Sequence, residues 1–205
     1  MWPTPARRRD PSLPCPEAPD MHDLFNPVPR FPSFEALVAA MQAWTDDPLA
    51  AARTNVVIFR GNPAARLMLI GEAPGAEEDI QRKPFVGPSG QLLDQILRSV
   101  DLDPATDVIV TNAVFRRPPN NRVPTPEEIA WYRPFLLEII RLVDPAIILL
   151  VGAVALRSVL DEKRGITQVR GGWMDWNGRH VMAIFHPAYL LRNPSREPGS
   201  PKALT

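Results

Sequence analysis

The chain has 205 residues, of which 45% are hydrophobic and 22% are charged, and its formal net charge at neutral pH is zero. A chain of this length and composition can bury a full hydrophobic core, and one domain is the expectation. The zero net charge excludes a bulk field that would draw nucleic acid or a membrane surface, so any such partner must be met by a local patch. No apolar run approaches the roughly 20 residues that span a bilayer.

The ends of the chain differ in composition from its middle. Many of the 25 prolines precede the first apolar pattern, so residues 1–32 are predicted to be an arm without fixed structure, residues 33–193 one domain, and residues 194–205 a similar tail. A single cysteine, Cys15, excludes an internal disulfide and suits a reducing compartment. The arginines at positions 7–9 precede no apolar segment, which argues against a secretory signal. We expect a cytoplasmic monomer.

Hydrophobic periodicity alternates between strand and helix along the domain. Residues 34–44 are apolar at helical spacing and predict the first helix. Short apolar runs predict strands at residues 66–73, 107–115, 146–152 and 181–185. Further helices are predicted after a cap at Ser89, from the TPEE sequence of residues 125–128 with Pro134 kinking or splitting the helix, and near residues 153–160. A hairpin-like segment, VRGGWMDWNGRHVMAIF, leads into the last strand.

Strands that alternate with helices and lack polar alternation are typical of a parallel sheet covered on both faces. The predicted fold is therefore α/β, a three-layer α/β/α sandwich with a central, mainly parallel four-stranded sheet. Ligands of such sheets bind outside the carboxyl ends of the strands. Three segments take that place: GEAPG at residues 71–75, TNAVFRRPPNNR at residues 111–122 and HPAYLLR at residues 186–192.

The GEAPG segment has an ordinary reading as a tight turn between strand and helix. It lacks the spacing of a phosphate-binding loop and of a dinucleotide fingerprint. Four acids, Glu72, Glu77, Glu78 and Asp79, would also repel a phosphate held there. Acids in this position suit a site where positive charge develops or where a water molecule must be held.

Two other side chains could belong to the core or to a site. Phe85 lies in a proline–glycine turn and could be core, or could offer its ring to a flat ligand, since stacking on a base contributes roughly 1–3 kcal/mol. Asn112 could brace its own turn. Its side chain also presents a donor beside an acceptor, which matches the edge of a nucleobase.

The last segment combines a histidine with apolar and basic residues. His186 at a strand end could be structural, but Leu190, Leu191 and Arg192 follow it, and apolar side chains beside an arginine are what a duplex-distorting loop requires. His22 and His180 receive no role. A second basic group could be a solvated loop or could grip backbone phosphates; its members are Arg116, Arg117 and Arg122.

Together, GEAPGAEEDIQRKPFVGPSGQLLD, TNAVFRRPPNNRVPTPEEI and HPAYLLR resemble the motifs of the family 4 uracil-DNA glycosylases, and the resemblance runs from about Gly61 to Arg192. It implies a DNA repair enzyme that flips uracil out of DNA and hydrolyses its N-glycosidic bond to leave an abasic site. The implied partner is uracil-containing DNA. The opening segment would then line the pocket for the flipped base.

The resemblance also implies roles for individual residues. Glu72 would position the hydrolytic water and favour a cationic sugar, and His186 would stabilise negative charge at uracil O2. Gly71 and the backbone of Ala73, Pro74 and Gly75 would contact the base. Glu78 would exclude the methyl group of thymine, Phe85 would stack and Asn112 would read the uracil edge. Leu190 and Leu191 would enter the minor groove, and the basic residues would contact DNA.

The sequence departs from the family in its cysteines. The family carries four that hold a [4Fe–4S] cluster, two before the first strand, one after the asparagine strand and one in the next helix. Here the last two positions hold Arg116 and Tyr132, and the segment before the strand, residues 45–55, has no cysteine. One thiol cannot replace four. We therefore expect no cluster and no other metal or cofactor.

Two smaller departures are Arg82, where the family has glycine, and the absence of an evident helix after the HPAYLLR segment. A branch that forms a covalent adduct through a histidine is rejected, because no histidine lies between Asn112 and Pro124. The main alternative is a non-catalytic uracil- or DNA-binding module, against which the presence of both Glu72 and His186 argues. An unrelated nucleotide-binding protein would need the missing phosphate loop.

Overall fold

A computed structural model describes residues 29–195 and residue 197 of the chain. Most of the predicted arm and tail, Cys15 included, lies outside the described residues, so the domain limits at residues 33 and 193 stay predictions. No helix within the described ranges is both long and apolar enough to cross a bilayer.

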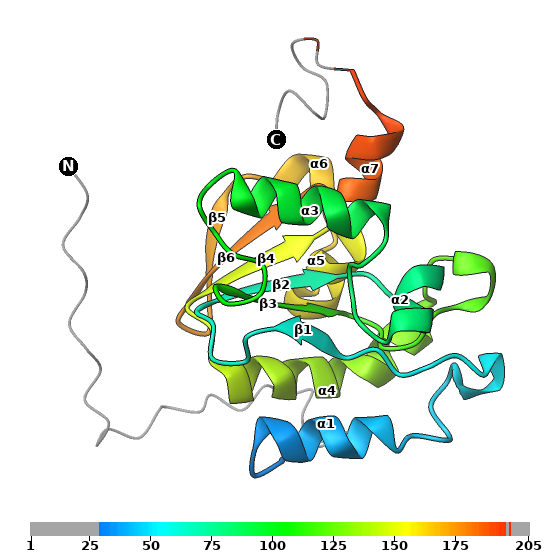
Figure 1. The fold of residues 1–205 in the computed structure, drawn as a ribbon. Coiled ribbons are helices and arrows are strands. Elements are labelled where there is room, and N and C mark those ends of the chain that lie inside the picture. The colour runs from blue at the N-terminus through cyan, green and yellow to red at the C-terminus, as the bar shows by residue number, and fades with distance from the viewer. Residues whose placement is uncertain (1–28, 196, 198–205) are drawn as a thin grey trace, which may run out of the picture.

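The described residues form a six-stranded sheet with the order β1-β3-β2-β4-β6-β5 (Figure 1). The strands are β1 (Phe59–Gly61), β2 (Leu67–Gly71), β3 (Val108–Asn112), β4 (Ile147–Val151), β5 (Trp173–Trp176) and β6 (Arg179–Ile184). The pairs β2–β3, β2–β4 and β4–β6 are all parallel, which confirms the predicted mainly parallel sheet.

The predicted count of four strands is wrong, because β1 and β5 add one antiparallel strand at each edge. β1 has only three residues and no apolar run of its own, and it pairs with β3. β5 is the first arm of the hairpin that the sequence indicated, but its residues alternate between exposed and half-buried, as an edge strand does.

Helices connect the strands. They are α1 (Phe34–Gln42), η1 (Ala50–Ala52), α2 (Ala76–Gln81), α3 (Pro88–Arg98), η2 (Pro119–Asn121), α4 (Pro126–Val143), α5 (Ala153–Leu160), α6 (Ile166–Val169) and α7 (Pro187–Arg192), η1 and η2 being single 3₁₀ turns. The segment HPAYLLR is thus a short helix rather than a loop.

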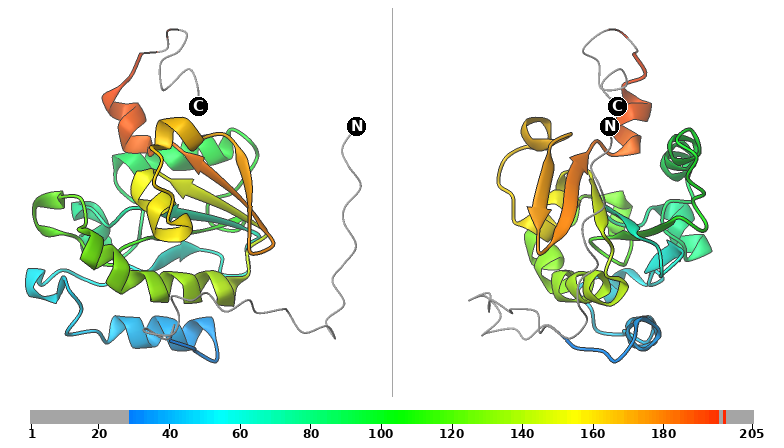
Figure 2. Two further views of the ribbon diagram at one scale, coloured as in Figure 1. Left: turned by 180° about the vertical axis from the view of Figure 1, so that it is seen from behind. Right: turned by 90° about the vertical axis from the view of Figure 1, so that its left-hand side faces the viewer.

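Helices cover both faces of the sheet, which confirms the three layers (Figures 1 and 2). Successive residues of a strand point to opposite faces. Met68 and Ile70 of β2 pack into the larger core with α1, α4 and α5. Leu69 between them packs on the other face with Leu93 and Leu97 of α3. The alternation along one strand therefore separates two hydrophobic cores.

The start of α4 agrees with its predicted capping box. The Thr125 side chain accepts from the Glu128 backbone N–H at 3.2 Å, and the Glu128 carboxylate accepts from the Thr125 N–H at 2.8 Å. Pro134 does not divide this helix, which is continuous over 18 residues. α3 begins at Pro88 with Gly87 as its N-cap, so the predicted cap at Ser89 is wrong by two positions.

The Thr125→Ala variant should lower the free energy of unfolding by about 1 kcal/mol, because it leaves an N–H at the start of α4 without its partner. Chemical denaturation measures this loss. Thr106→Ala, at an exposed threonine outside any helix, is the matched control and should leave the free energy unchanged. Equal values for both variants would show that the capping box contributes nothing.

Candidate active site

The carboxyl ends of β2, β3 and β6 meet at one edge of the sheet. Parallel pairing sets Gly71 opposite Asn112, and β6 leads directly to His186 two strands away. Beside these ends lies a cavity of ≈ 430 Å³, within the range usual for sites that bind small ligands. Its lining residues are Glu72, Ala73, Pro74, Gly75, Glu78, Phe85, Ser89, Asn112, Pro118, Asn121, Arg122, Val123, His186, Ala188 and Arg192.

The cavity therefore brings together every predicted catalytic and base-contacting residue except Gly71, which lies directly behind it. A Cβ added to Gly71 would lie 2.4 Å from Asn112 Oδ1 and 2.5 Å from the Phe85 ring. No other residue fits in that space. The turn after Gly71 is held to the end of β3, since Ala113 N–H donates to the Gly71 carbonyl at 2.9 Å and Val114 N–H to the Glu72 carbonyl at 3.0 Å.

The turn that carries Phe85 is tight. Phe85 has a φ of 56°, a left-handed conformation that costs a residue with a side chain about 1 kcal/mol or more. A Cβ on Gly90 would lie only 1.8 Å from the Phe85 carbonyl oxygen, so the start of α3 must be glycine there. The Phe85 ring is buried and lies 5.5 Å from the His186 ring, at 26° to it.

Glu78 joins the two turns that form the cavity wall. Its Oε2 accepts from the Gly75 N–H at 3.1 Å, and its Oε1 accepts from the N–H groups of Val86 and Gly87 at 2.9 and 2.8 Å. The side chain is only 7% exposed. Both oxygens of this buried carboxylate are therefore engaged by backbone, and the GEAPG turn cannot move independently of the Phe85 turn.

His186 is the N-cap of α7. Its Nδ1 accepts from the Ala188 N–H at 3.2 Å, so the proton of the neutral ring is on Nε2. Burial and, to a smaller extent, the positive charge of Arg192 lower the pKa of His186 to about 4, against an opposing effect of Glu78. The imidazole is therefore neutral at physiological pH and presents an N–H donor at Nε2.

Glu72 has the opposite perturbation. Burial raises its pKa above the ordinary value, and the charges of Arg157 and Arg192 only partly offset this effect. Among the described residues its carboxylate has no hydrogen-bond partner, whereas the carboxylate of Glu78 in the same cavity binds three backbone N–H groups. A half-buried carboxylate of this kind can hold water or stabilise a cation.

Asn112 ends β3, lines the same cavity as Glu72 and His186, and is 1% exposed. Within the described part of the chain its side-chain amide makes no hydrogen bond to protein. Its position on a strand, with the Gly71 backbone against it, fixes the amide's direction. The unused donor and acceptor can serve the edge of a ligand.

The predicted basic group is only partly at the surface, and for Arg116 the prediction is wrong. Arg116 is 7% exposed and its guanidinium binds Asp47 and two backbone carbonyls, which leaves it no free face for a phosphate. Arg117 donates to Asn121 at 2.6 Å, and Arg122 makes a bidentate pair with Glu128. The exposed Arg192 lines the cavity itself.

Leu190 and Leu191 were both predicted to enter the minor groove, and for Leu190 this prediction is also wrong. Leu190 is 3% exposed, whereas Leu191 is 44% exposed. Because the segment is helical, neighbouring side chains point about 100° apart, and both leucines cannot leave the same face. Tyr189, which sequence reasoning missed, is the second exposed apolar side chain of α7, at 36%.

Other residues of the cavity were also missed, namely Ser89, Pro118, Asn121, Val123 and Ala188. Three of them lie in the loop before α4, whose run of proline and asparagine was noticed only for its arginines. Within the ranges that the structure describes, no group of three histidine, cysteine or acidic side chains could hold a metal ion.

Comparison with known proteins identifies the family. Residues 58–204 match the model of the uracil DNA glycosylase superfamily. A type-4 uracil-DNA glycosylase of Thermotoga maritima is 48% identical over 152 residues, which cover 73% of this chain and 79% of that protein. A protein of the same description from Archaeoglobus fulgidus is 35% identical, over 79% of this chain and 85% of that protein. Another, from Saccharolobus solfataricus, is 39% identical, over 69% of this chain and 69% of that protein. The chain belongs to the uracil DNA glycosylase superfamily.

Proposed function

We propose that the protein is a uracil-DNA glycosylase, which takes a uracil nucleotide out of the DNA stack and hydrolyses the bond between base and sugar. The observation that carries the proposal is that Glu72, His186 and the side-chain amide of Asn112 line one cavity. The type-4 enzymes that the chain resembles support it, as does its place in the superfamily.

His186 would act on the base. As the glycosidic bond breaks, negative charge develops on the uracil ring, and a fixed N–H donor stabilises that charge in a site shielded from water. A neutral imidazole with its proton on Nε2 is such a donor, and the Ala188 N–H holds the ring in this tautomer. The positive charge of the adjacent Arg192 favours the same anion.

Glu72 would act on the sugar. Loss of the base leaves positive charge on the sugar ring, which an ionised carboxylate stabilises, and the same oxygen can hold the attacking water. The absence of a protein partner for this carboxylate among the described residues leaves it free to do both.

Phe85 and Asn112 would bind the flipped base. The Phe85 and His186 rings are 5.5 Å apart, and a base between them would need about 7 Å, twice an ordinary contact distance. A base stacked on Phe85 would therefore present its own edge, which carries O2, to the imidazole. Asn112 would pair with the opposite edge, and stacking offsets part of the cost of flipping, a few kcal/mol.

Glu78 would exclude thymine by being unable to move. With three backbone N–H groups bound to its two oxygens, the side chain cannot turn aside for a methyl group at C5. Arg117, Arg122 and Arg192 would contact backbone phosphates, and Leu191 would enter the space that the base leaves. These assignments rest on the resemblance together with the exposure of the residues.

The non-catalytic binding module has no observation in its favour. A half-buried carboxylate without a partner, such as that of Glu72, weakens the binding of a neutral base. A module that only binds uracil would therefore gain nothing from Glu72. A monomeric state and a cytoplasmic location stay predictions.

The Glu72→Gln and His186→Ala variants should each lose about 10²–10³-fold or more in single-turnover excision of uracil from an oligonucleotide, since each removes stabilisation of the transition-state charge. The controls are Glu77→Gln, an exposed acid on α2, and His180→Ala, both of which should cleave like the parent protein. Rates near the parent's in both site variants would contradict the mechanism.

Glu72→Gln should also raise the stability of the fold at pH 7. The pKa of Glu72 is raised in the folded state, so its stabilising contribution is present below the unfolded pKa and is lost as pH rises through the folded pKa. At neutral pH the buried charge therefore opposes folding, and glutamine removes it. Thermal unfolding of the two proteins at pH 7 and pH 4 tests this, because the difference should shrink at the lower pH.

The excision rate should be constant at neutral and mildly alkaline pH and should fall on acidification. Glu72 takes up its proton above the ordinary glutamate pKa, which removes the charge that the sugar needs. His186, with a pKa of about 4, stays neutral throughout that range. A rate that instead fell with rising pH near 6.5 would show that a protonated histidine is required.

Glu78→Gln should lower the ratio of the excision rates of uracil and thymine. An amide can accept from the three N–H groups through only one oxygen, so the two turns will loosen. The ratio of the two single-turnover rates measures the effect, with Glu77→Gln as the neighbouring control. An unchanged ratio, with the fold retained, would mean that Glu78 does not set this selectivity.

A further inference from the structure

A buried ionic cluster lies where the loop that borders the cavity begins. No step of the mechanism proposed above involves it. Arg116 Nε donates to Asp47 Oδ2 at 2.6 Å, and the Tyr132 hydroxyl donates to Asp47 Oδ1. The exposed fractions of Asp47, Arg116 and Tyr132 are 4%, 7% and 0%. We call these three residues the ionic cluster.

The ionic cluster has its hydrogen bonds satisfied. Arg116 also donates to the backbone carbonyls of Thr54 and Trp44, the latter at 2.8 Å, and Asp47 Oδ1 accepts from the Leu49 N–H at 3.2 Å. Burial and the charge of Asp47 raise the pKa of Tyr132, so the hydroxyl keeps the proton that it donates. Buried charges persist only when they are paired in this way.

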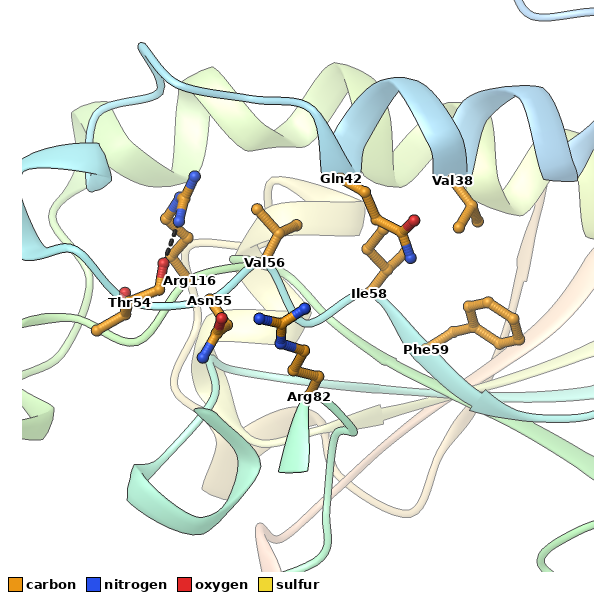
Figure 3. Close-up of a pocket in the computed structure, with 9 residues that line it drawn as sticks. All are labelled: Val38, Gln42, Thr54, Asn55, Val56, Ile58, Phe59, Arg82 and Arg116. Atoms are coloured by element: carbon orange, nitrogen blue, oxygen red, sulfur yellow. Dashed lines mark hydrogen bonds between the residues drawn. The ribbon is translucent and has the colours of Figure 1, made fainter. Parts of the chain in front are cut away.

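Aromatic rings enclose the cluster on one side. The Trp44 ring lies 5.9 Å from that of Tyr132, 5.2 Å from that of Trp131 and 4.6 Å from that of Phe135. On the other side the Arg116 side chain borders a second cavity, of ≈ 330 Å³, where it lies beside Thr54 and away from Phe59 (Figure 3). The ion pair is thus shielded by tryptophan and tyrosine rings rather than exposed to solvent.

Three segments far apart in the sequence are joined at this point. Asp47 and the Thr54 and Trp44 carbonyls belong to the segment after α1, Arg116 to the segment after β3, and Tyr132 to α4. The neighbouring backbone is fixed as well, since the Thr54 hydroxyl donates to the Arg117 carbonyl at 3.3 Å.

Arg116 is also the first residue of the loop that borders the site cavity. Residues 116–123 contribute four of the lining side chains and carry the half-buried Arg117 and the exposed Arg122. At its far end the loop is held by the bidentate pair between Arg122 and Glu128. The ionic cluster is the anchor at the near end.

By the resemblance to the family 4 enzymes, the same residues stand where that family has its iron–sulfur ligands. Arg116 and Tyr132 hold two of the four cysteine positions, and Asp47 lies in the segment that should hold the other two. A guanidinium cannot ligate iron, and the described residues contain no thiolate. This donor set does not fit a [4Fe–4S] cluster.

We propose that Asp47, Arg116 and Tyr132 form a metal-free structural centre that takes the place of the family's cluster and positions the loop of residues 116–123 over the cavity. An ion pair with a tyrosine ties the same three segments together through hydrogen bonds instead of metal–sulfur bonds. Arg116 and Tyr132 are thus positioning residues for the loop, and neither contacts the substrate.

The first experiment measures iron and acid-labile sulfide in protein made with added iron and purified without oxygen. We expect a colourless protein with neither element in stoichiometric amount, and with a melting temperature that chelators do not change. Stoichiometric iron and sulfide would overturn the proposal.

The second experiment compares Arg116→Met with Arg117→Met, the adjacent and more exposed arginine. Loss of Arg116 leaves Asp47 buried without its counter-ion, and the melting temperature should fall by about 10 °C. The matched variant should stay within about 2 °C of the parent protein. Amide hydrogen exchange in residues 116–123 should rise only in the first variant.

Tyr132→Phe is the milder test if Arg116→Met fails to fold. It removes one hydrogen bond and keeps the ring, so exchange in the loop should rise while the rest of the protein is unchanged. The dissociation constant for a uracil-containing strand should increase several-fold, whereas the single-turnover rate at saturating protein should stay constant, because Glu72 and His186 lie outside the loop. Unchanged loop exchange and affinity would overturn the proposal.

The activity readout rests on the proposed function, but the other readouts do not. If the parent protein excises no uracil, the iron content, the melting temperatures and the loop exchange still decide on the ionic cluster. If those three agree with the proposal and excision is absent, only the proposed function has failed.

Discussion

Parallel pairing of β2 with β3 and β4 is the constraint on which the site depends. It places Gly71 level with Asn112 at one edge of the sheet and brings His186 to the same edge from β6. The helix layers change sides at this point, α3 lying on one face and α4 and α5 on the other. Open α/β sheets bind their ligands at such a point. The two turns that complete the cavity are then joined by one carboxylate, Glu78.

Burial has opposite consequences for the two proposed catalytic groups, and both consequences suit the chemistry. It lowers the pKa of His186, so that a neutral donor would face the base, and it raises the pKa of Glu72, so that a poorly solvated carboxylate would face the sugar. In the proposed mechanism, one environment would thus provide a hydrogen-bond donor for the base and a negative charge for the sugar. Burial does not select the tautomer of His186. The Ala188 N–H does so by donating to Nδ1, which leaves the proton on Nε2.

Sequence reasoning brought together residues whose shared location follows from their places at strand ends, and the structure places them around one cavity. Glu72, Asn112 and His186 each end or follow an apolar run, and parallel strands bring such ends together. Arg116 misled because its partner Asp47 lies 69 residues earlier, and no local pattern reveals a buried ion pair.

The other errors also have physical reasons. Leu190 was misassigned because HPAYLLR was read as a loop, although a proline after a cap residue also begins helices. The edge strand β1 has three residues and depends on β3 for its conformation. The fold class could be predicted from periodicity, whereas the burial of single charged side chains required the tertiary structure.

The most direct test of the central claim is single-turnover incubation of the parent protein with an end-labelled oligonucleotide that contains one uracil, followed by alkaline cleavage of abasic sites. We expect a single product cut at the uracil, and none from the same strand with thymine in its place. A strand that stays intact with the protein in excess, at a pH where Glu72 is ionised, would contradict the account.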